Sequence, residues 1–394
     1  MIEETRALCE KYDMPVDPLS LCGDLPVGLR QKVEILKVMA RGAKIIILDE
    51  PTAVLAPQET EELFEQLLNL KKEGYTIIFI SHKLHEVKYI CDRLTVLKDG
   101  RSIGTYEVAN VTPEEISRLM VGRDVKIEYD KTPQQFGEKI LTVEGLNYTD
   151  KFGTKKVNNL HFSLRAGEVL GVAGIEGNGQ KEAMEILTGN LAAESGSIQY
   201  RGTELLGMSI TDNRKAGIAH VPEDRNLNGC APEMSVRDNL IATCMNKLSK
   251  NTILDEAKIE EYCDECVKEF LVKTAGLDVS IKSLSGGNVQ KAIVAREFKA
   301  GADVIVLSQP TRGVDVGAME FIHKKILEMR DEKKSLILVS ADLAELNALS
   351  DRIIIFHQGQ VAGVLDDVPN VTEEELGLYM LGLKSDSEER LKEA

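Results

Sequence analysis

Short apolar runs recur along the chain, separated by longer stretches that carry apolar residues at helical spacing. In the first part of the chain the runs are "KIIIL", "TIIFI" and "RLTVL", which begin at Lys44, Thr76 and Arg93. In the later part they are "VIVL", "SLILV" and "RIIIF", which begin at Val304, Ser335 and Arg352. Runs that are apolar on both faces are typical of buried parallel strands joined by crossover helices. The pattern therefore predicts an α/β fold with doubly wound parallel sheets.

A different pattern precedes the later runs. The stretches "ILTVEGLNY", from Ile140, and "VNNLHFSLRAGEVLGVAG", from Val157, alternate apolar and polar positions. Alternation with a period of two is typical of strands that bury one face. We expect a smaller antiparallel portion here that leads into the first parallel strand.

The chain contains an internal repeat, which determines its domain organisation. The segments 25–52 and 284–311 align without gaps at a constant offset of 259, and ten of their 28 pairs are identical. The same offset carries "FISHKLHEV" onto "LVSADLAEL". Copy two begins near Ile140, and subtracting the offset from 140 gives −119. We therefore expect that roughly 120 residues of copy one would lie before Met1.

These limits divide the chain into four parts. The first copy, incomplete at its front, spans residues 1–122, and the polar linker spans 123–139. The second copy spans 140–382, and a charged tail follows at 383–394. A chain of 394 residues is long enough for each copy to bury a core of its own.

Composition narrows the possible functions. The net charge is −16 and no basic stripe offsets it, which argues against a nucleic-acid partner. No apolar run approaches the roughly 20 residues that span a bilayer, and the start lacks the features of a secretion signal. Seven cysteines without framework spacing fit reduced thiols in the cytoplasm. Cys263 and Cys266 fit an amphipathic helix better than a metal site, because no second pair lies nearby.

A glycine-rich loop follows the strand "EVLGVAG". Gly174, Gly177 and Gly179 have the spacing of a phosphate-binding loop, in which backbone N–H groups face the anion at a helix N-terminus. Such a loop normally ends in Lys and then Ser or Thr, whereas this chain has Gln180 and Lys181. The loop predicts a nucleotide site that is poorly equipped for chemistry. A plain glycine turn between strand and helix is the alternative.

In copy one, polar groups end two neighbouring strands. Asp49 ends the first, where a carboxylate can hold Mg²⁺ through water, and Glu50 follows, where a general base can orient an attacking water. His82 ends the next strand. The alternative is that the acids only cap a helix and that the histidine is structural. Three such groups at the carboxyl ends of parallel strands favour a ligand site, because α/β sheets bind ligands there.

These motifs resemble the ATP-binding cassette family. "LSGGNVQ" resembles its signature, "IILDEPTA" its Walker B with the catalytic Glu50, "ISH" its switch histidine His82, and "GIEGNGQ" a modified Walker A. The resemblance covers nearly the whole chain. It implies RecA-like cores, each a parallel sheet flanked by helices, with an antiparallel β portion and a helical subdomain. It also implies ATP and Mg²⁺ as cofactors.

In that family each ATP lies between the Walker motifs of one cassette and the signature of the other. Site one would combine Asp49, Glu50 and His82 with the signature Ser285, Gly286 and Gly287. Site two would combine the loop from Gly174 to Gln180 with Ser308, Gln309, Ala341 and the altered signature that ends at Gly28. The acids, the lysine and the histidine are all replaced in site two. We expect it to hold nucleotide while site one hydrolyses ATP.

The tandem arrangement resembles the ATPase subunits of bacterial sugar and nucleoside importers. "AQPTRG"-like and "GNGQ" features favour the nucleoside branch. The resemblance implies integral-membrane permease subunits as partners, an extracellular substrate-binding protein as an indirect partner, and a place on the cytoplasmic face of the cell membrane. The copy-one Walker A is missing from the sequence, so we expect this chain alone to hydrolyse ATP poorly. A non-transport tandem cassette and a non-hydrolysing fragment are the alternatives.

Overall fold

The chain divides into two compact units, unit 1 (Met1–Val125) and unit 2 (Lys126–Ala394). The computed structural model describes residues 2–12, 14–22, 25, 27–52, 57–81, 83–98, 100–121, 129, 131–132, 134–250, 253–368 and 371–391. None of the helices in these ranges is both long enough and apolar enough to cross a membrane. Each unit is described by itself.

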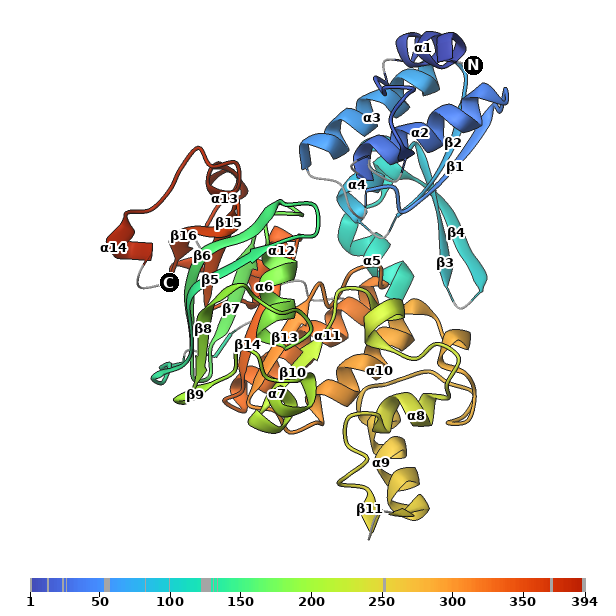
Figure 1. Cartoon of the computed structure of the whole chain (residues 1–394). Helices are drawn as coiled ribbons and strands as arrows, with labels where there is room; N and C mark the ends of the chain where they lie inside the picture. The colour runs from blue at the N-terminus through green and yellow to red at the C-terminus, as the bar shows by residue number, and fades with distance from the viewer. Residues whose placement is uncertain are drawn as a thin grey trace. The chain divides into compact units, whose positions relative to one another are not determined.

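Unit 2 is built on a sheet with the strand order β10-β13-β14-β7-β15-β16. The apolar runs form its parallel strands, and β16 alone among these six pairs antiparallel. The strands are β7 (Val169–Ala173), β10 (Ile218–Val221), β13 (Val304–Ser308), β14 (Ser335–Val339), β15 (Arg352–His357) and β16 (Gln360–Leu365). This architecture, visible in Figure 1, confirms the α/β prediction.

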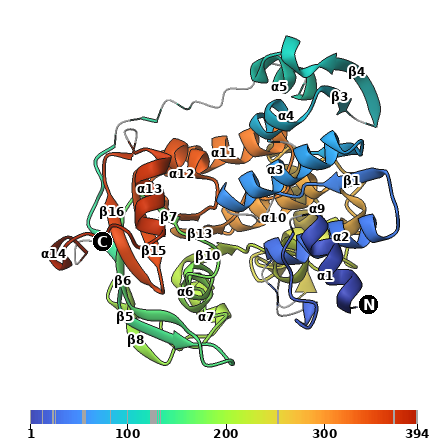
Figure 2. The same ribbon diagram turned by 90° about the horizontal axis from the view of Figure 1, so that it is seen from above.

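The two faces of this sheet bury two separate cores, because successive side chains of a strand point to opposite faces. One core joins the sheet to the antiparallel strands β5, β6 and β8 and to helix α6; β9 extends this antiparallel sheet at its edge. The other joins it to helices on the opposite face, which Figure 2 shows beside the sheet. The covering elements are β5 (Lys139–Thr149), β6 (Lys155–Arg165), β8 (Ser195–Tyr200), β9 (Thr203–Glu204), α6 (Gln180–Leu187), α10 (Gly286–Phe298), α11 (Val316–Asp331), α12 (Leu343–Leu349) and α13 (Glu373–Met380).

A helical portion lies between β10 and β13 in the sequence. It contains the π-helical turn η3 (Arg225–Gly229), α8 (Val236–Ile241), the hairpin of β11 (Ser249–Lys250) and β12 (Ile253–Leu254), α9 (Glu256–Glu269) and η4 (Ile281–Ser283). Helix α7 (Ile210–Ala216) comes just before β10. Ser235 and Asp238 form a capping box at the start of α8. The short helix α14 (Glu388–Leu391) lies near the end of the chain.

Cys263 and Cys266 lie on α9, as predicted, and both are buried. Burial raises the pKa of Cys263 to about 12 and that of Cys266 to about 11, so both remain protonated thiols at neutral pH. Among the described residues, no cluster of three or more His, Cys, Asp and Glu side chains is arranged to hold a metal ion.

Unit 1 repeats the second half of unit 2. Its elements are α1 (Ile2–Lys11), α2 (Val27–Ala40), β1 (Ile45–Asp49), α3 (Pro57–Lys72), β2 (Thr76–Ile80), α4 (Leu84–Ile90), β3 (Arg93–Lys98), β4 (Arg101–Glu107), η2 (Val108–Asn110) and α5 (Pro113–Val121). Adding 259 to the bounds of β1, β2, α3, α4 and β3 gives those of β13, β14, α11, α12 and β15. The pairing Ile45↔Thr76 in unit 1 becomes Val304↔Ser335 in unit 2 with the same offset. The repeat is therefore structural, down to the register of the strands.

The sheet of unit 1 differs from that of unit 2 in two respects. In the described residues, β1 pairs with β2 and β3 pairs with β4, as two separate sheets. The prediction that "RLTVL" is a parallel strand is wrong for this unit, because β3 pairs only with β4 and antiparallel. In unit 2 the equivalent strand, β15, pairs with β16 on one side and, in parallel, with β7 on the other.

Burial on both faces is also a wrong prediction for the unit 1 strands. Ile47 is 64% exposed and Ile78 is 47% exposed, whereas their counterparts Val306 and Ile337 are 0% exposed. The unit 2 residues belong to the core that includes the antiparallel strands and α6. The unit 1 strands are apolar on that face too, but the sequence holds no elements equivalent to this cover.

Candidate functional site

The glycine loop of unit 2 joins β7 to α6 and has the backbone that a phosphate-binding loop needs. Gly177 and Gly179 have φ of 93° and 96°, in the left-handed region that favours glycine. A Cβ added to Gly179 would lie 2.0 Å from the carbonyl oxygen of Lys156, so only glycine fits there. Nothing lies within 4 Å of a Cβ added to Gly177, which leaves that part of the loop open. The loop and the N-terminus of α6 therefore suit a phosphate group.

The two residues after this loop differ from a catalytic phosphate loop in position as well as in type. Gln180 is buried, and its Nε2 donates a hydrogen bond to the carbonyl oxygen of Ile175 at 3.1 Å. A Cβ added to Gly174 would lie 2.2 Å from that nitrogen, so the side chain of Gln180 packs directly on the loop. Lys181 is 60% exposed, and its ammonium group lies 4.0 Å from Glu185. Neither of these two side chains therefore brings a positive charge to the place of the usual lysine.

The carboxyl end of β13 holds the replaced acids of unit 2. Ser308 is buried, and its Oγ lies 3.4 Å from Nε2 of His220 on the neighbouring strand β10. Gln309 has φ of 51°, and its N–H donates to the carbonyl oxygen of Val339 at 2.8 Å. Its Oε1 accepts a hydrogen bond from the N–H of Ala341 at 3.2 Å. Each replaced side chain is thus held by a partner within the protein.

His220 was not predicted from the sequence as a residue of this region. Burial lowers its pKa from 6.5 to about 4, against a smaller opposite effect of Glu297. The imidazole is therefore neutral at physiological pH, and it brings no positive charge to the end of β13. A strand pattern predicts which positions are buried, but it does not predict which residue of a neighbouring strand lies beside them. The sequence therefore gave no signal for the contact between His220 and Ser308.

The carboxyl end of β1 holds the retained acids of unit 1. Asp49 ends the strand and is exposed. Glu50 follows with φ of 45°, and its N–H donates to the carbonyl oxygen of Ile80 at 2.9 Å. This backbone geometry matches that of Gln309, so the two copies present the base position in the same way. His82 lies outside the described residues, and its predicted place beside these acids stays a prediction.

The signature residues lie at the start of a helix in each unit. Ser285 is the N-cap residue of α10, and Gly286 and Gly287 form its first turn. The Nδ2 of Asn288 donates a hydrogen bond to Ser285 Oγ at 2.8 Å. In unit 1, Gly28 lies in the first turn of α2, at the equivalent place.

An arginine of the "VPEDRNLNG" segment joins this signature to the loop after β13. Arg225 Nη1 donates hydrogen bonds to the carbonyl oxygens of Arg312 and Gly313, at 2.9 and 3.2 Å. A Cβ added to Gly286 would lie 2.9 Å from Arg225 Nη2. Arg312 in turn forms an ion pair with Glu223. Three loops of unit 2 therefore meet at one guanidinium group.

Sequence reasoning missed a buried carboxylate that both copies share. Thr52 donates a hydrogen bond to Glu86 at 2.8 Å, and Thr311 donates one to Glu345 at 2.7 Å. Both pairs stand at the offset of 259 and are identical in the aligned copies. The sequence did contain a signal for this pair, because the threonine and the glutamate are identical in two copies that differ at most other positions. Buried polar side chains need hydrogen-bond partners, so such a pair is retained together.

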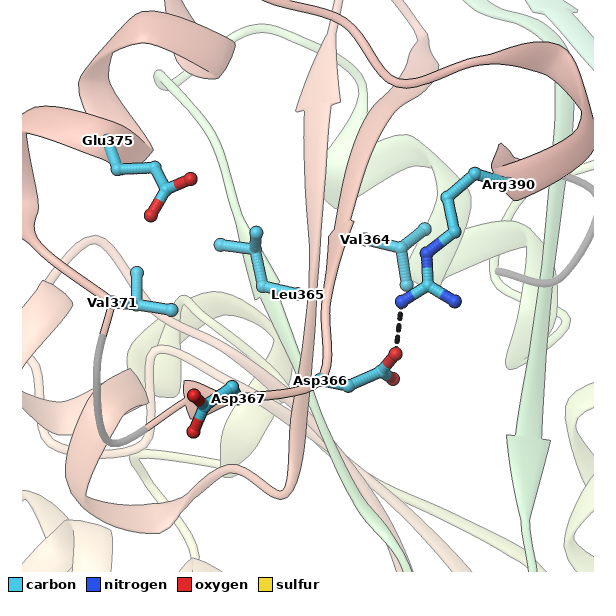
Figure 3. A pocket seen from close by; sticks show the side chains of 7 residues that line it. All are labelled: Val364, Leu365, Asp366, Asp367, Val371, Glu375 and Arg390. Atoms are coloured by element: carbon cyan, nitrogen blue, oxygen red, sulfur yellow. Dashed lines mark hydrogen bonds and ion pairs between the residues drawn. The ribbon is translucent and has the colours of Figure 1, made fainter.

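A shallow pocket near the end of unit 2 is not suited to phosphate. Figure 3 shows Asp366, Asp367 and Glu375 around it, with Arg390 paired to Asp366. Three carboxylates against one guanidinium repel an anion. The glycine loop is therefore the better candidate for nucleotide in this unit.

The chain is similar to known proteins. The sequence pattern of the family described as ABC transporter matches residues 157–312. The chain is 44% identical over 377 residues to the nucleoside import ATP-binding protein NupA of Lactococcus lactis, an alignment that covers 95% of this chain and 74% of the relative. It is 38% identical over 382 residues to the guanosine import ATP-binding protein NupO of Bacillus subtilis, with coverages of 96% and 75%.

A relative named for a sugar has similar identity. The xylose import ATP-binding protein XylG of Photobacterium profundum is 38% identical over 379 residues, with coverages of 95% and 75%. Among solved structures, the dimeric bacterial ABC transporter cassette MJ0796 matches 57% of this chain and 98% of its own, with a TM-score of 0.51 and 19% identity. The structural likeness supports the fold alone.

Proposed function

The chain belongs to the ABC transporter family of ATP-binding proteins, and we propose that it energises the import of a nucleoside. It is an ATPase subunit of the group that serves nucleoside and sugar importers. The nucleoside class is supported by 44% identity to NupA, compared with 38% to XylG. A simple sugar is the second candidate, since NupO and XylG are equally similar to the chain.

The partners of this subunit are integral-membrane permease subunits, with an extracellular substrate-binding protein as an indirect partner. The chain would act on the cytoplasmic face of the membrane, where it takes up ATP. Import ATP-binding relatives over nearly the whole chain support this assignment. The transported molecule does not need to touch this subunit.

The two units divide the work. Unit 1 supplies Asp49 and Glu50 for hydrolysis, and unit 2 holds nucleotide on its glycine loop. The observation that carries this proposal is the state of the replaced side chains, because Gln180, Ser308 and Gln309 all engage protein atoms. These three side chains are held in place by hydrogen bonds within the protein. None of them is a general base, and none carries a charge that binds a metal ion.

The residues present fit both cofactors to different degrees. The open glycine loop and the N-terminus of α6 fit the phosphates of ATP in unit 2. The exposed carboxylate of Asp49 fits Mg²⁺, which prefers carboxylate and water oxygens. When bound, Mg²⁺ neutralises the charge of the phosphates. Glu50 accepts the proton of the attacking water, and Ser285 and the signature glycines offer donors to phosphate oxygens.

The test uses the chain extended at its N-terminus by a segment that supplies unit 1 with a glycine phosphate loop. ATP binding is measured by filter retention, and turnover by phosphate release. We expect Glu50→Gln to lower turnover by about 10²-fold or more and to leave binding intact. Substantial turnover that survives in Glu50→Gln and depends on Gln180 would overturn the division of work.

A further inference from the structure

One buried carboxylate in unit 1 joins the loop after β1 to the loop after β2. Glu86 is 1% exposed. Its Oε2 accepts hydrogen bonds from Thr52 Oγ1 at 2.8 Å and from Ser81 Oγ at 2.9 Å. Its Oε1 lies 3.3 Å from Lys83 Nζ, which also donates to the carbonyl oxygen of Thr52 at 3.2 Å. Glu50 precedes this network by two residues, and Ser81 and Lys83 flank His82 in the sequence.

Unit 2 has the same three residue types at the offset of 259, and it keeps the hydrogen bond between the threonine and the glutamate. Thr311 Oγ1 donates to Glu345 Oε1 at 2.7 Å, and Glu345 is 3% exposed. Asp342 N–H donates to Ser340 Oγ at 3.0 Å, as Lys83 N–H donates to Ser81 Oγ at 3.0 Å. We call the Thr–Glu–Ser group of each unit, Thr52–Glu86–Ser81 and Thr311–Glu345–Ser340, its loop brace.

The two buried carboxylates have nitrogen partners on different elements. Lys83 is the partner in unit 1, but the equivalent residue of unit 2 is Asp342. His323, from α11, lies 2.8 Å from Glu345 Oε1 instead, and its equivalent in unit 1 is Phe64. A buried carboxylate needs a donor or a counter-charge. Both copies have the buried carboxylate. Its nitrogen partner comes from Lys83, just before α4, in unit 1 and from His323, on α11, in unit 2.

Retention of the brace contrasts with the chemistry beside it. Asp49 and Glu50 of unit 1 become Ser308 and Gln309 in unit 2, yet the Thr–Glu–Ser group is unchanged. Both base positions also share a strained backbone, with φ of 45° for Glu50 and 51° for Gln309. A non-glycine residue stays in this conformation only where surrounding contacts hold it. The backbone bond to β2 or β14 holds one side of the loop, and the brace holds the other.

From this geometry we infer that Glu86 is a positioning residue, which fixes the loop that carries Glu50 against the loop formed by Ser81 and Lys83. The catalytic consequence rests on the proposed function, in which Glu50 is the general base. A displacement of such a base by about 1 Å costs roughly 10²-fold in rate. Glu345 holds the corresponding loops of unit 2, where no base is present.

Hydrogen exchange of the full chain, read by mass spectrometry, tests the brace without any need for turnover. We expect Glu86→Gln to raise the exchange of amides in 50–52 and 81–83 by about tenfold or more, because the new amide group faces Lys83 with donors. The matched variant Glu345→Gln should raise exchange in 309–311 and 340–342 and leave unit 1 unchanged. Thr52→Val, which keeps the volume of the side chain, should reproduce the local effect in 50–52.

A rescue separates positioning from general destabilisation. Adding Lys83→Met to Glu86→Gln removes the ammonium group that faces the new amide group, and protection should return in both loops. Unchanged exchange in both loops of Glu86→Gln, or a uniform rise that includes the β3–β4 hairpin, overturns the inference.

Turnover is measured separately on the N-terminally extended chain. There Glu86→Gln should lower kcat and leave KM unchanged, because the loops carry the base and not the phosphate cradle. An extended chain with native Glu86 that shows no turnover contradicts the proposed function, whereas the exchange result stands by itself.

Discussion

The two units fold the same strand pattern into the same register but bury it to different extents. Ile78 and Ile337 are the same residue type at equivalent positions, and their exposed fractions are 47% and 0%. The difference lies in what covers them. In unit 2 the antiparallel strands and α6 close over this face, whereas the sequence contains no equivalent elements for unit 1. Strand pattern therefore sets register, and covering elements set burial.

The same comparison divides the chemistry. In unit 2 the glycine loop stands beside Ser308 and Gln309, whereas unit 1 keeps Asp49 and Glu50 at the equivalent positions. Each set of groups lies at the carboxyl end of its parallel strands, where α/β sheets bind ligands. Matched substitutions in the two units can therefore separate acid chemistry from nucleotide binding.

The largest expected effect is on hydrolysis. In the N-terminally extended chain, Glu50→Gln should lower ATP turnover by about 10²–10⁴-fold, because a general base contributes this factor. Gln309→Glu is the matched variant in unit 2, and it should not lower turnover. Phosphate release at saturating ATP is the measurement. A chain in which Gln180→Ala lowers turnover as much as Glu50→Gln would place the chemistry in unit 2 instead.

A buried ion pair gives the next effect. Arg330 Nη2 lies 2.8 Å from Asp351 Oδ1, with side chains 3% and 6% exposed, and Asp351 also accepts from the N–H of Val169. The equivalent pair, Lys71 and Asp92, has side chains 43% and 72% exposed. Breaking a buried pair costs about 3–5 kcal/mol and an exposed one about 0–1 kcal/mol. Asp351→Asn should therefore destabilise unit 2 far more than Asp92→Asn destabilises unit 1.

Urea unfolding of the full chain, followed by exchange of β14 and β2 amides, measures both changes. Equal losses in the two variants would mean that Asp92 is also buried in solution.

Much of this difference between the units could not be predicted from sequence. The repeat and the glycine loop could be predicted from the sequence, because the repeat is visible as a constant offset of 259 and the loop as three closely spaced glycines. Exposure of Ile47 could not, since an apolar strand has the same pattern whether or not another element covers it. The contact between His220 and Ser308 joins strands 88 residues apart, and no local pattern encodes it. The threonine and the glutamate of the loop brace are identical in both copies of the sequence. Only the structure shows that they are hydrogen bonded to each other.

Acid should affect unit 2 through His220, which is buried beside Ser308. Its pKa is lowered by burial to about 4, below the 6.5 of the unfolded chain. The unfolded state therefore takes up the proton first, so stability is fully present above pH 6.5 and is lost as the pH falls toward 4. The shift corresponds to about 3 kcal/mol. His220→Gln should remove this pH dependence.

Denaturant unfolding at pH 7, 5.5 and 4.5 measures the effect as the difference between the native chain and His220→Gln. Other carboxyl groups titrate in both proteins and cancel in this difference. Parallel pH profiles for the two proteins would show that His220 is accessible to protons in the folded state.

The smallest expected effect tests the uncovered face directly. Ile337→Val removes one buried methylene and should cost unit 2 about 0.5–1.5 kcal/mol, whereas Ile78→Val in unit 1 should cost near zero, because its side chain already contacts water. Both substitutions keep β propensity, so a difference reports burial alone. Urea unfolding of the two variants measures it. If Ile78→Val costs as much as Ile337→Val, another surface covers this face in solution, and dilution should then lower the cost, since association depends on concentration.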